Sequence, residues 1–114
     1  MLTVNIIPND RGNPQGKLAD AELLFSENAY IGDQKIVEPL AGLKLVGFAI
    51  WERRGGGGRN VTFPARQYSV DGERRSFALL RPITDAVAQE RIRDLILAAY
   101  AEYEEKSSRQ PRGR

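Results

Sequence analysis

Residues 43–52 have the sequence LKLVGFAIWE, and this run determines which fold the rest of the chain can adopt. In an extended strand, successive side chains point to opposite faces. One face then carries Leu45, Ala49 and Trp51, and the other carries Val46, Phe48 and Ile50. A strand that is apolar on both faces is typical of the centre of a sheet, or of a strand covered on both sides. The run therefore predicts a central strand.

Three further strands are expected upstream of this run. Residues 2–7 are rich in β-branched side chains. Residues 17–26 place four apolar side chains on one face and two carboxylates on the other. These are Ala19, Ala21, Leu23 and Phe25, opposite Asp20 and Glu22. Between the two strands, residues 8–16 are dense in turn-forming residues, which predicts an exposed loop. Residues 29–37 predict a weaker strand, interrupted by Gly32 and Asp33.

Downstream, residues 60–68 and 75–80 predict two strands, and Asp71–Gly72 predicts the hairpin turn between them, because Gly adopts a positive φ without steric cost. Pro82 ends the sheet and precedes a helix that Thr84 or Asp85 can cap. Apolar residues then recur at helical spacing, which predicts one face that must pack on the sheet. They are Ile92, Leu95, Ile96, Ala99, Tyr100 and Tyr103.

These elements predict an α+β fold, in which an antiparallel β-sheet of about five strands carries one C-terminal α-helix. The 114 residues suit a single domain. We assign residues 1–106 to that domain and residues 107–114 to a disordered basic tail.

Composition excludes several classes of site. The chain contains no Cys and no His. Disulfides, thiolate nucleophiles and zinc–sulfur sites are therefore absent, and so are the commonest general base and metal ligand. Because no base–nucleophile pair is visible, we expect no enzymatic activity, no cofactor and no small-molecule substrate. Residues 1–8 do not form a secretory signal, and no apolar run approaches membrane-spanning length, so a cytoplasmic location without membrane contact is expected.

Charge is unevenly distributed along the chain. Residues 1–52 carry a net charge of −3, whereas residues 53–114 carry +5. Residues 53–81 contain seven arginines against only Asp71 and Glu73. A concentration of arginine is the electrostatic footprint that polyanions bind.

The first candidate site is the hairpin around Asp71–Gly72, which carries Arg66, Arg74 and Arg75. Guanidinium groups pair with phosphates, and Tyr68 beside them could stack on a base. The alternative is a solvated strand face whose charges prevent edge-to-edge aggregation.

The second candidate is the glycine-rich segment 53–59, in which Arg53, Arg54 and Arg59 could contact a nucleic-acid backbone. It lacks the Lys-Ser/Thr of a phosphate-binding loop, and the alternative is a mobile hairpin tip. Arg109, Arg112 and Arg114 in the tail could add non-specific affinity or simply solubilise the chain end.

Two further groups are better explained by structure than by binding. Tyr100 and Tyr103 could form a stacking platform, but their helical spacing favours the core. The pair Asp20 and Glu22 could hold a metal, but without His or an EF-hand spacing an exposed strand face is expected.

In their order and spacing along the chain, residues 16–25, 43–52, 60–68, 71–73, 82–83 and 97–103 together resemble the SpoVG family of septation and sporulation regulators. Residues 60–68 resemble its strand ending in Met-Pro-Ser and basic residues, and residues 71–73 resemble its Asp-Gly-Glu turn. Residues 82–83 resemble its Pro-Ile step, residues 97–103 its closing helix, and residues 16–25 and 43–52 its second and third strands. Residues 27–42 form an insertion, and the turn at 53–59 is longer than the family's.

The resemblance implies a single SpoVG-like domain in a small bacterial regulator that binds DNA and RNA and forms a homodimer through edge strands. The family's basic residues carry over to Arg66, Arg74 and Arg75 only. The sequence therefore predicts a nucleic-acid-binding regulator. The alternative is a protein–protein interaction module that pairs through its edge strands without nucleic acid.

Overall fold

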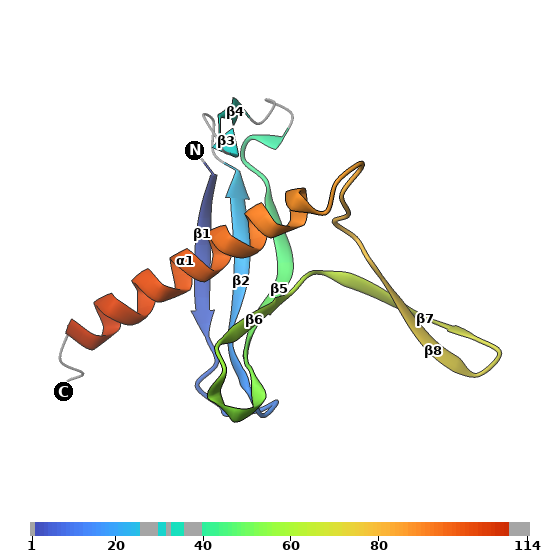
Figure 1. Ribbon diagram of the computed structural model, residues 1–114, viewed down its shortest axis with the longest axis horizontal. Helices are drawn as coiled ribbons and strands as arrows, with labels where there is room; N and C mark the ends of the chain where they lie inside the picture. Colours follow the sequence, from blue (N-terminus) through green and yellow to red (C-terminus); the bar gives the residue numbers. More distant parts are fainter. Residues whose placement is uncertain (1, 26–29, 32, 36–39, 110–114) are drawn as a thin grey trace.

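β5 (Lys44–Glu52) is the central strand predicted around residues 43–52. It lies between β2 (Lys17–Phe25) and β6 (Arg59–Thr62), and β1 (Leu2–Pro8) pairs with the far side of β2. The resulting antiparallel sheet has the order β1-β2-β5-β6, and α1 (Val87–Arg109) crosses one of its faces (Figure 1). This computed structural model describes residues 2–25, 30–31, 33–35 and 40–109, and it confirms the α+β fold class.

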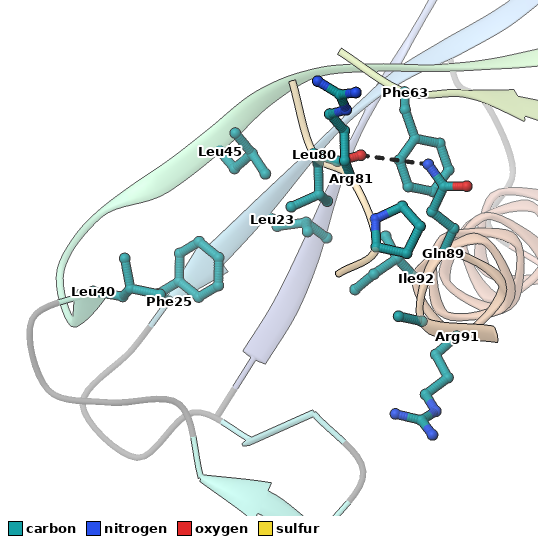
Figure 2. Close-up of a pocket in the computed structure, with 12 residues that line it drawn as sticks. Leu23, Phe25, Leu40, Leu45, Phe63, Leu80, Arg81, Gln89, Arg91 and Ile92 are labelled. Atoms are coloured by element: carbon teal, nitrogen blue, oxygen red, sulfur yellow. Dashed lines mark hydrogen bonds between the residues drawn. The ribbon is translucent and has the colours of Figure 1, made fainter. Parts of the chain in front are cut away.

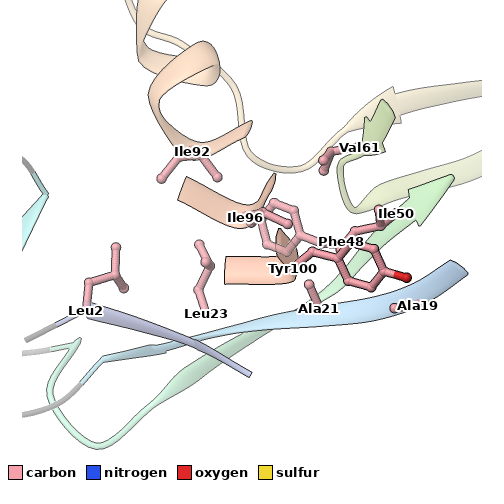
Figure 3. Close-up of a cluster of buried hydrophobic side chains, with 10 residues drawn as sticks. All are labelled: Leu2, Ala19, Ala21, Leu23, Phe48, Ile50, Val61, Ile92, Ile96 and Tyr100. Carbon is pink, nitrogen blue, oxygen red and sulfur yellow. The ribbon is translucent and has the colours of Figure 1, made fainter. Parts of the chain in front are cut away.

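The core lies between α1 and the sheet. Figure 3 shows Ile92, Ile96 and Tyr100 of the helix packed among the buried side chains of the strands. Those strand side chains are Leu2, Ala19, Ala21, Leu23, Phe48, Ile50 and Val61. Ile96 and Phe48 are completely buried, and burying such a side chain contributes about 2 kcal/mol to folding. The predicted apolar face of the helix is therefore confirmed.

A bulge in β5 alters the predicted alternation. Leu23 pairs with Leu45, but Ala21 pairs with Phe48, so β5 has one extra residue between these two pairs. The extra residue places Leu45 on the same side as Phe48, against the core, and leaves Val46 50% exposed. The expectation that Val46 shares a face with Phe48 and Ile50 is therefore wrong.

The strand predicted at 60–68 is broken in two. β6 ends at Thr62, and the next strand begins at Ala65. Pro64 causes the break because it has no backbone N–H to continue the ladder. Its buried side chain lies beside Gly47, which has a φ of +106° and no Cβ to obstruct the close approach of Pro64. Phe63 packs edge-to-face on Phe48, with ring centroids 5.2 Å apart.

Beyond this break, β7 (Ala65–Val70) and β8 (Glu73–Ala78) pair only with each other in the described part of the chain. We call residues 65–78 the arm, and Figure 1 shows it projecting from the sheet to the right. Asp71 and Gly72 form its turn with φ values of 52° and 80°, as predicted. The main sheet therefore has four described strands rather than about five.

The remaining elements modify the predicted boundaries. Of the strand predicted at 29–37, the described residues form two short strands, β3 (Tyr30–Ile31) and β4 (Gln34–Lys35), which pair antiparallel with each other. Residues 29, 32, 36 and 37 lie outside the described residues. Asp85 caps α1, its Oδ1 accepting a hydrogen bond of 3.0 Å from the Val87 backbone N–H. The helix continues to Arg109, so residues 107–109 are helical rather than part of a disordered tail. Residues 110–114 lie outside the described residues.

The contact between Gly47 and Pro64 yields a stability prediction. A Cβ at position 47 would lie 2.9 Å from the Pro64 Cβ, on a backbone conformation that favours glycine. Gly47→Ala should therefore lower the free energy of unfolding by about 2 kcal/mol, measured by urea denaturation. Gly57→Ala is the matched control, because its Cβ would meet nothing within 4 Å. Equal stability of the two variants would contradict the proposed role of this contact.

Candidate nucleic-acid interface

The register of the arm decides which of its side chains share a face. Arg66 pairs with Phe77, and Tyr68 pairs with Arg75. Because side chains alternate along each strand, these four residues lie on one face of the arm, which we call the aromatic face. Arg74 pairs with Ser69 and lies on the opposite face. The predicted cluster of Arg66, Arg74 and Arg75 is therefore divided between two faces.

The arginines of the arm are exposed and only partly paired. Arg75 Nη2 lies 3.0 Å from Glu73 Oε1, and both side chains are more than half exposed. Exposed pairs of this kind contribute little and exchange readily for another anion. Among the described residues, Arg66 and Arg74 have no carboxylate partner, so two guanidinium groups of the arm are free to meet a polyanion.

Arg53 and Arg54 belong to a separate surface. The Arg53 N–H donates a 2.9 Å hydrogen bond to Gly58 O, and Arg54–Gly56 forms a 3-10 turn. This loop lies at the lower end of the sheet in Figure 1, whereas the arm extends to the side. Both arginines line a hollow beside Trp51 and Gln15. The structure therefore does not bring Arg53 and Arg54 together with the arginines of the arm.

Arg59 is engaged within the molecule rather than in a binding surface. Both of its terminal nitrogens donate to the Glu104 carboxylate, with Nη2 lying 2.7 Å from Oε2. Its guanidinium also lies 5.0 Å from the Tyr100 ring centroid. These contacts join the edge strand β6 to the second half of α1. Arg59 was predicted to bind nucleic acid, and the structure shows its guanidinium paired with Glu104.

Tyr100 and Tyr103 belong to the core, as their spacing indicates. Tyr100 is 7% exposed, and the two rings stack with centroids 6.0 Å apart. Burial raises the pKa of the Tyr100 phenol above its ordinary value of 10.0, and the nearby Glu104 carboxylate raises it further, while the Arg59 guanidinium lowers it. The folded protein therefore keeps the phenol neutral to a higher pH than the unfolded chain does.

The base of the arm is held against the body by both of its strands. Phe63 precedes β7, and the Arg93 guanidinium lies 5.8 Å from its ring centroid. Leu80 follows β8, and its carbonyl accepts a 3.4 Å hydrogen bond from Gln89 Nε2 (Figure 2). Both residues line an apolar hollow of about 340 Å³ between the start of α1 and the ends of β2 and β5. The arm is thus anchored at residues 63–64 and 79–80.

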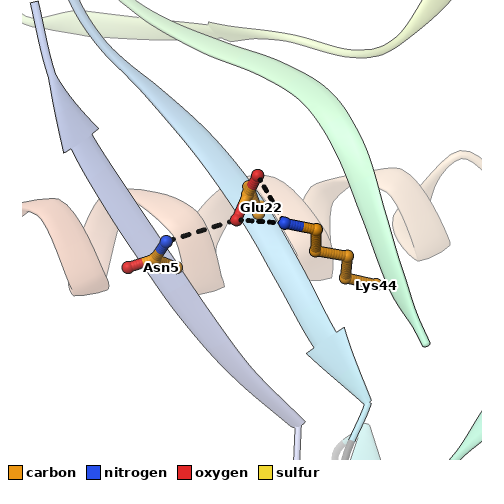
Figure 4. A network of polar contacts seen from close by, with 3 residues as sticks. All are labelled: Asn5, Glu22 and Lys44. Atoms are coloured by element: carbon orange, nitrogen blue, oxygen red, sulfur yellow. Dashed lines mark hydrogen bonds and ion pairs between the residues drawn. The ribbon is translucent and has the colours of Figure 1, made fainter. Parts of the chain in front are cut away.

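Each carboxylate of the predicted pair on β2 contacts a lysine ammonium group. Glu22 accepts hydrogen bonds from Asn5 Nδ2 at 3.2 Å and from Lys44 Nζ at 3.3 Å (Figure 4). Asp20 pairs with Lys17 at 2.6 Å. No group of three or more acidic residues suited to a metal ion occurs among the residues that the structure describes. The Asp20 side chain is exposed as expected, whereas the Glu22 side chain is largely covered.

Phe77 is the member of the aromatic face that sequence reasoning missed. The sequence contained a signal for Phe77. A two-residue turn at Asp71–Gly72 pairs Val70 with Glu73, and this pair determines all the remaining pairs of the hairpin. Counting back along this register places Phe77 opposite Arg66. The sequence prediction placed Tyr68 beside the arginines and did not include Phe77.

Comparison with known proteins leaves the resemblance to the SpoVG family as a prediction. No family model matches the chain, and neither a curated protein nor a solved structure matches it.

In the described residues, α1 is too polar to cross a membrane, and no other helix has the length for it.

The raised pKa of Tyr100 predicts how stability depends on pH. Above about pH 10 the unfolded chain loses the phenol proton while the folded chain keeps it, so rising pH favours unfolding. The free energy of unfolding should fall more steeply above pH 10 in the parent than in Tyr100→Phe, measured by urea denaturation at a series of pH values. Below pH 10 the difference between the two proteins should stay constant. Parallel curves throughout would contradict the raised pKa.

Proposed function

We propose that this protein is a nucleic-acid-binding regulator without enzymatic activity, resembling SpoVG and acting in the cytoplasm on DNA or RNA. The observation that carries this proposal is the arm. It presents Arg66, Arg74 and Arg75 on a hairpin that stands apart from the body, with every residue of 65–77 exposed. Guanidinium groups on such a projection can follow a phosphate backbone without steric conflict with the sheet.

The distribution of the other charges supports the arm as the main contact. Arg59 is neutralised by Glu104, and the exposed carboxylates Glu90 and Asp94 lie on α1. These carboxylates offset the exposed Arg91 between them, so in the described residues the arm carries the densest group of exposed arginines. Arg53 and Arg54 would add a second, separate contact reached only by a longer ligand.

We also propose that two copies associate through edge strands. β1 and β6 are the outer strands of the described sheet, and each has one side without a strand partner. Unpaired edges are the usual site of strand addition. The same edges favour the second candidate function, a protein–protein interaction module in which the arginines meet an acidic protein surface. Absence of binding to any nucleic acid at low salt would favour this second function.

The arm arginines can be tested as a group. Replacing Arg66, Arg74 and Arg75 together with Ala should weaken binding to a mixed-sequence oligonucleotide at least about tenfold, because the phosphate contacts and their released counterions are lost. The slope of log affinity against log salt should fall in magnitude by about 3 on duplex DNA if each arginine contacts one phosphate. Fluorescence anisotropy titrations at several salt concentrations measure both quantities.

The matched control for this variant removes the same charge elsewhere. Arg11, Arg91 and Lys106 are exposed and lie outside the arm, so their joint replacement by Ala changes the net charge equally. Affinity and salt slope should stay close to those of the parent. If the control lost as much affinity as the arm variant, binding would depend on overall charge and the assignment to the arm would fail.

A further inference from the structure

The aromatic face of the arm carries two exposed rings in contact with each other. The Tyr68 and Phe77 centroids are 5.8 Å apart at an interplanar angle of 61°, and each side chain is 41% exposed. Aromatic side chains of this size normally contribute to a core or an interface. Here they stand on a two-stranded hairpin, far from the core cluster under α1. Their exposure indicates a surface that meets a ligand.

Each ring of the pair lies across the hairpin from a guanidinium group. Arg66 is opposite Phe77, and Arg75 is opposite Tyr68. The reverse face of the arm contains Gln67, Ser69 and Ser76 with Arg74, and it has no aromatic side chain. Val70 and Glu73 complete the aromatic face, and Glu73 pairs with Arg75 there. Aromatic rings and guanidinium groups therefore occur together on one face only. This combination matches a ligand that repeats flat rings and anionic groups along its length.

We infer that the aromatic face binds single-stranded nucleic acid, with unpaired bases stacking on Tyr68 and Phe77 and phosphates contacting Arg66 and Arg75. This inference rests on the proposed function and adds the class of ligand. In a duplex, the bases stack on one another and their ring faces are covered, so exposed aromatic rings gain nothing from them. In a single strand the ring faces are available to aromatic side chains, and each stacked base contributes about 1–3 kcal/mol.

Binding to three labelled probes tests the inference. The probes are an oligothymidylate and an oligouridylate of about twelve nucleotides, a length within the range that single-strand sites occupy, and a duplex of the same length. The parent should bind the single strands more tightly than the duplex. Phe77→Ala and Tyr68→Ala should each weaken single-strand binding about tenfold, with less than a twofold effect on the duplex. Ser76→Ala, on the opposite face of β8, is the control and should bind as the parent does.

Phe77→Trp separates stacking from any effect on the arm's structure. It keeps a flat ring and should retain single-strand affinity, and its added fluorescence should be quenched by the oligothymidylate and not by the duplex. Duplex binding equal to single-strand binding, or no effect of the two alanine variants, would overturn this inference and leave the proposed function standing. Absence of binding to all three probes at low salt would overturn both. A smaller mass in solution for Phe77→Ala would place the aromatic face between copies of the chain and overturn the stacking assignment.

Discussion

The packing of one helix across a four-stranded sheet is the constraint on which the rest of the structure depends. Ile96 and Phe48 exclude water completely at the centre of this contact, and Tyr100 extends it toward the edge strand. The Arg59–Glu104 pair then joins β6 to the same helix from the outside. Because the helix covers only one face, the opposite face remains open, with Val46 exposed and the Asn5–Glu22–Lys44 contacts lying on it.

The arm follows from a single local event at residues 63–64. Pro64 ends the backbone pairing of β6, and its side chain is buried against Gly47 while Phe63 is held by Phe48 and Arg93. The chain leaves the sheet at this fixed point, and the following residues pair with each other instead. An isolated two-stranded hairpin is marginally stable in water, so its firm anchorage at the base and its tight turn both contribute to keeping it formed. The surface proposed for binding is therefore exposed because the chain leaves the sheet at Phe63 and Pro64.

The arginines of this protein have different structural roles, because some pack against the body and others are exposed on the arm or on a separate loop. Arg59 and Arg93 face aromatic rings of the body and contribute to packing. Arg66 and Arg74 stand on the arm without a carboxylate partner among the described residues, and Arg53 and Arg54 occupy a separate loop. A count of arginines along residues 53–81 cannot distinguish these roles, since it measures density in sequence and not position in space. The proposed interface is consequently smaller than the arginine-rich region, and it includes a phenylalanine that no count of charges would find.

Local sequence patterns were sufficient to predict the elements that depend only on residues close together in the chain. The alternation in 17–26, the Asp71–Gly72 turn and the apolar stripe of α1 were predictable, because each depends on the backbone preferences and side-chain periodicity of neighbouring residues. The sequence narrowed the helix cap to Thr84 or Asp85, and the structure shows that it is Asp85. Tertiary structure alone decided the bulge at Val46–Gly47, the departure of the arm from the sheet, and the pairing of Arg59 with Glu104. Each of these depends on contacts between residues far apart in the chain, such as Gly47 with Pro64 and β6 with α1, and periodicity within one segment contains no information about them.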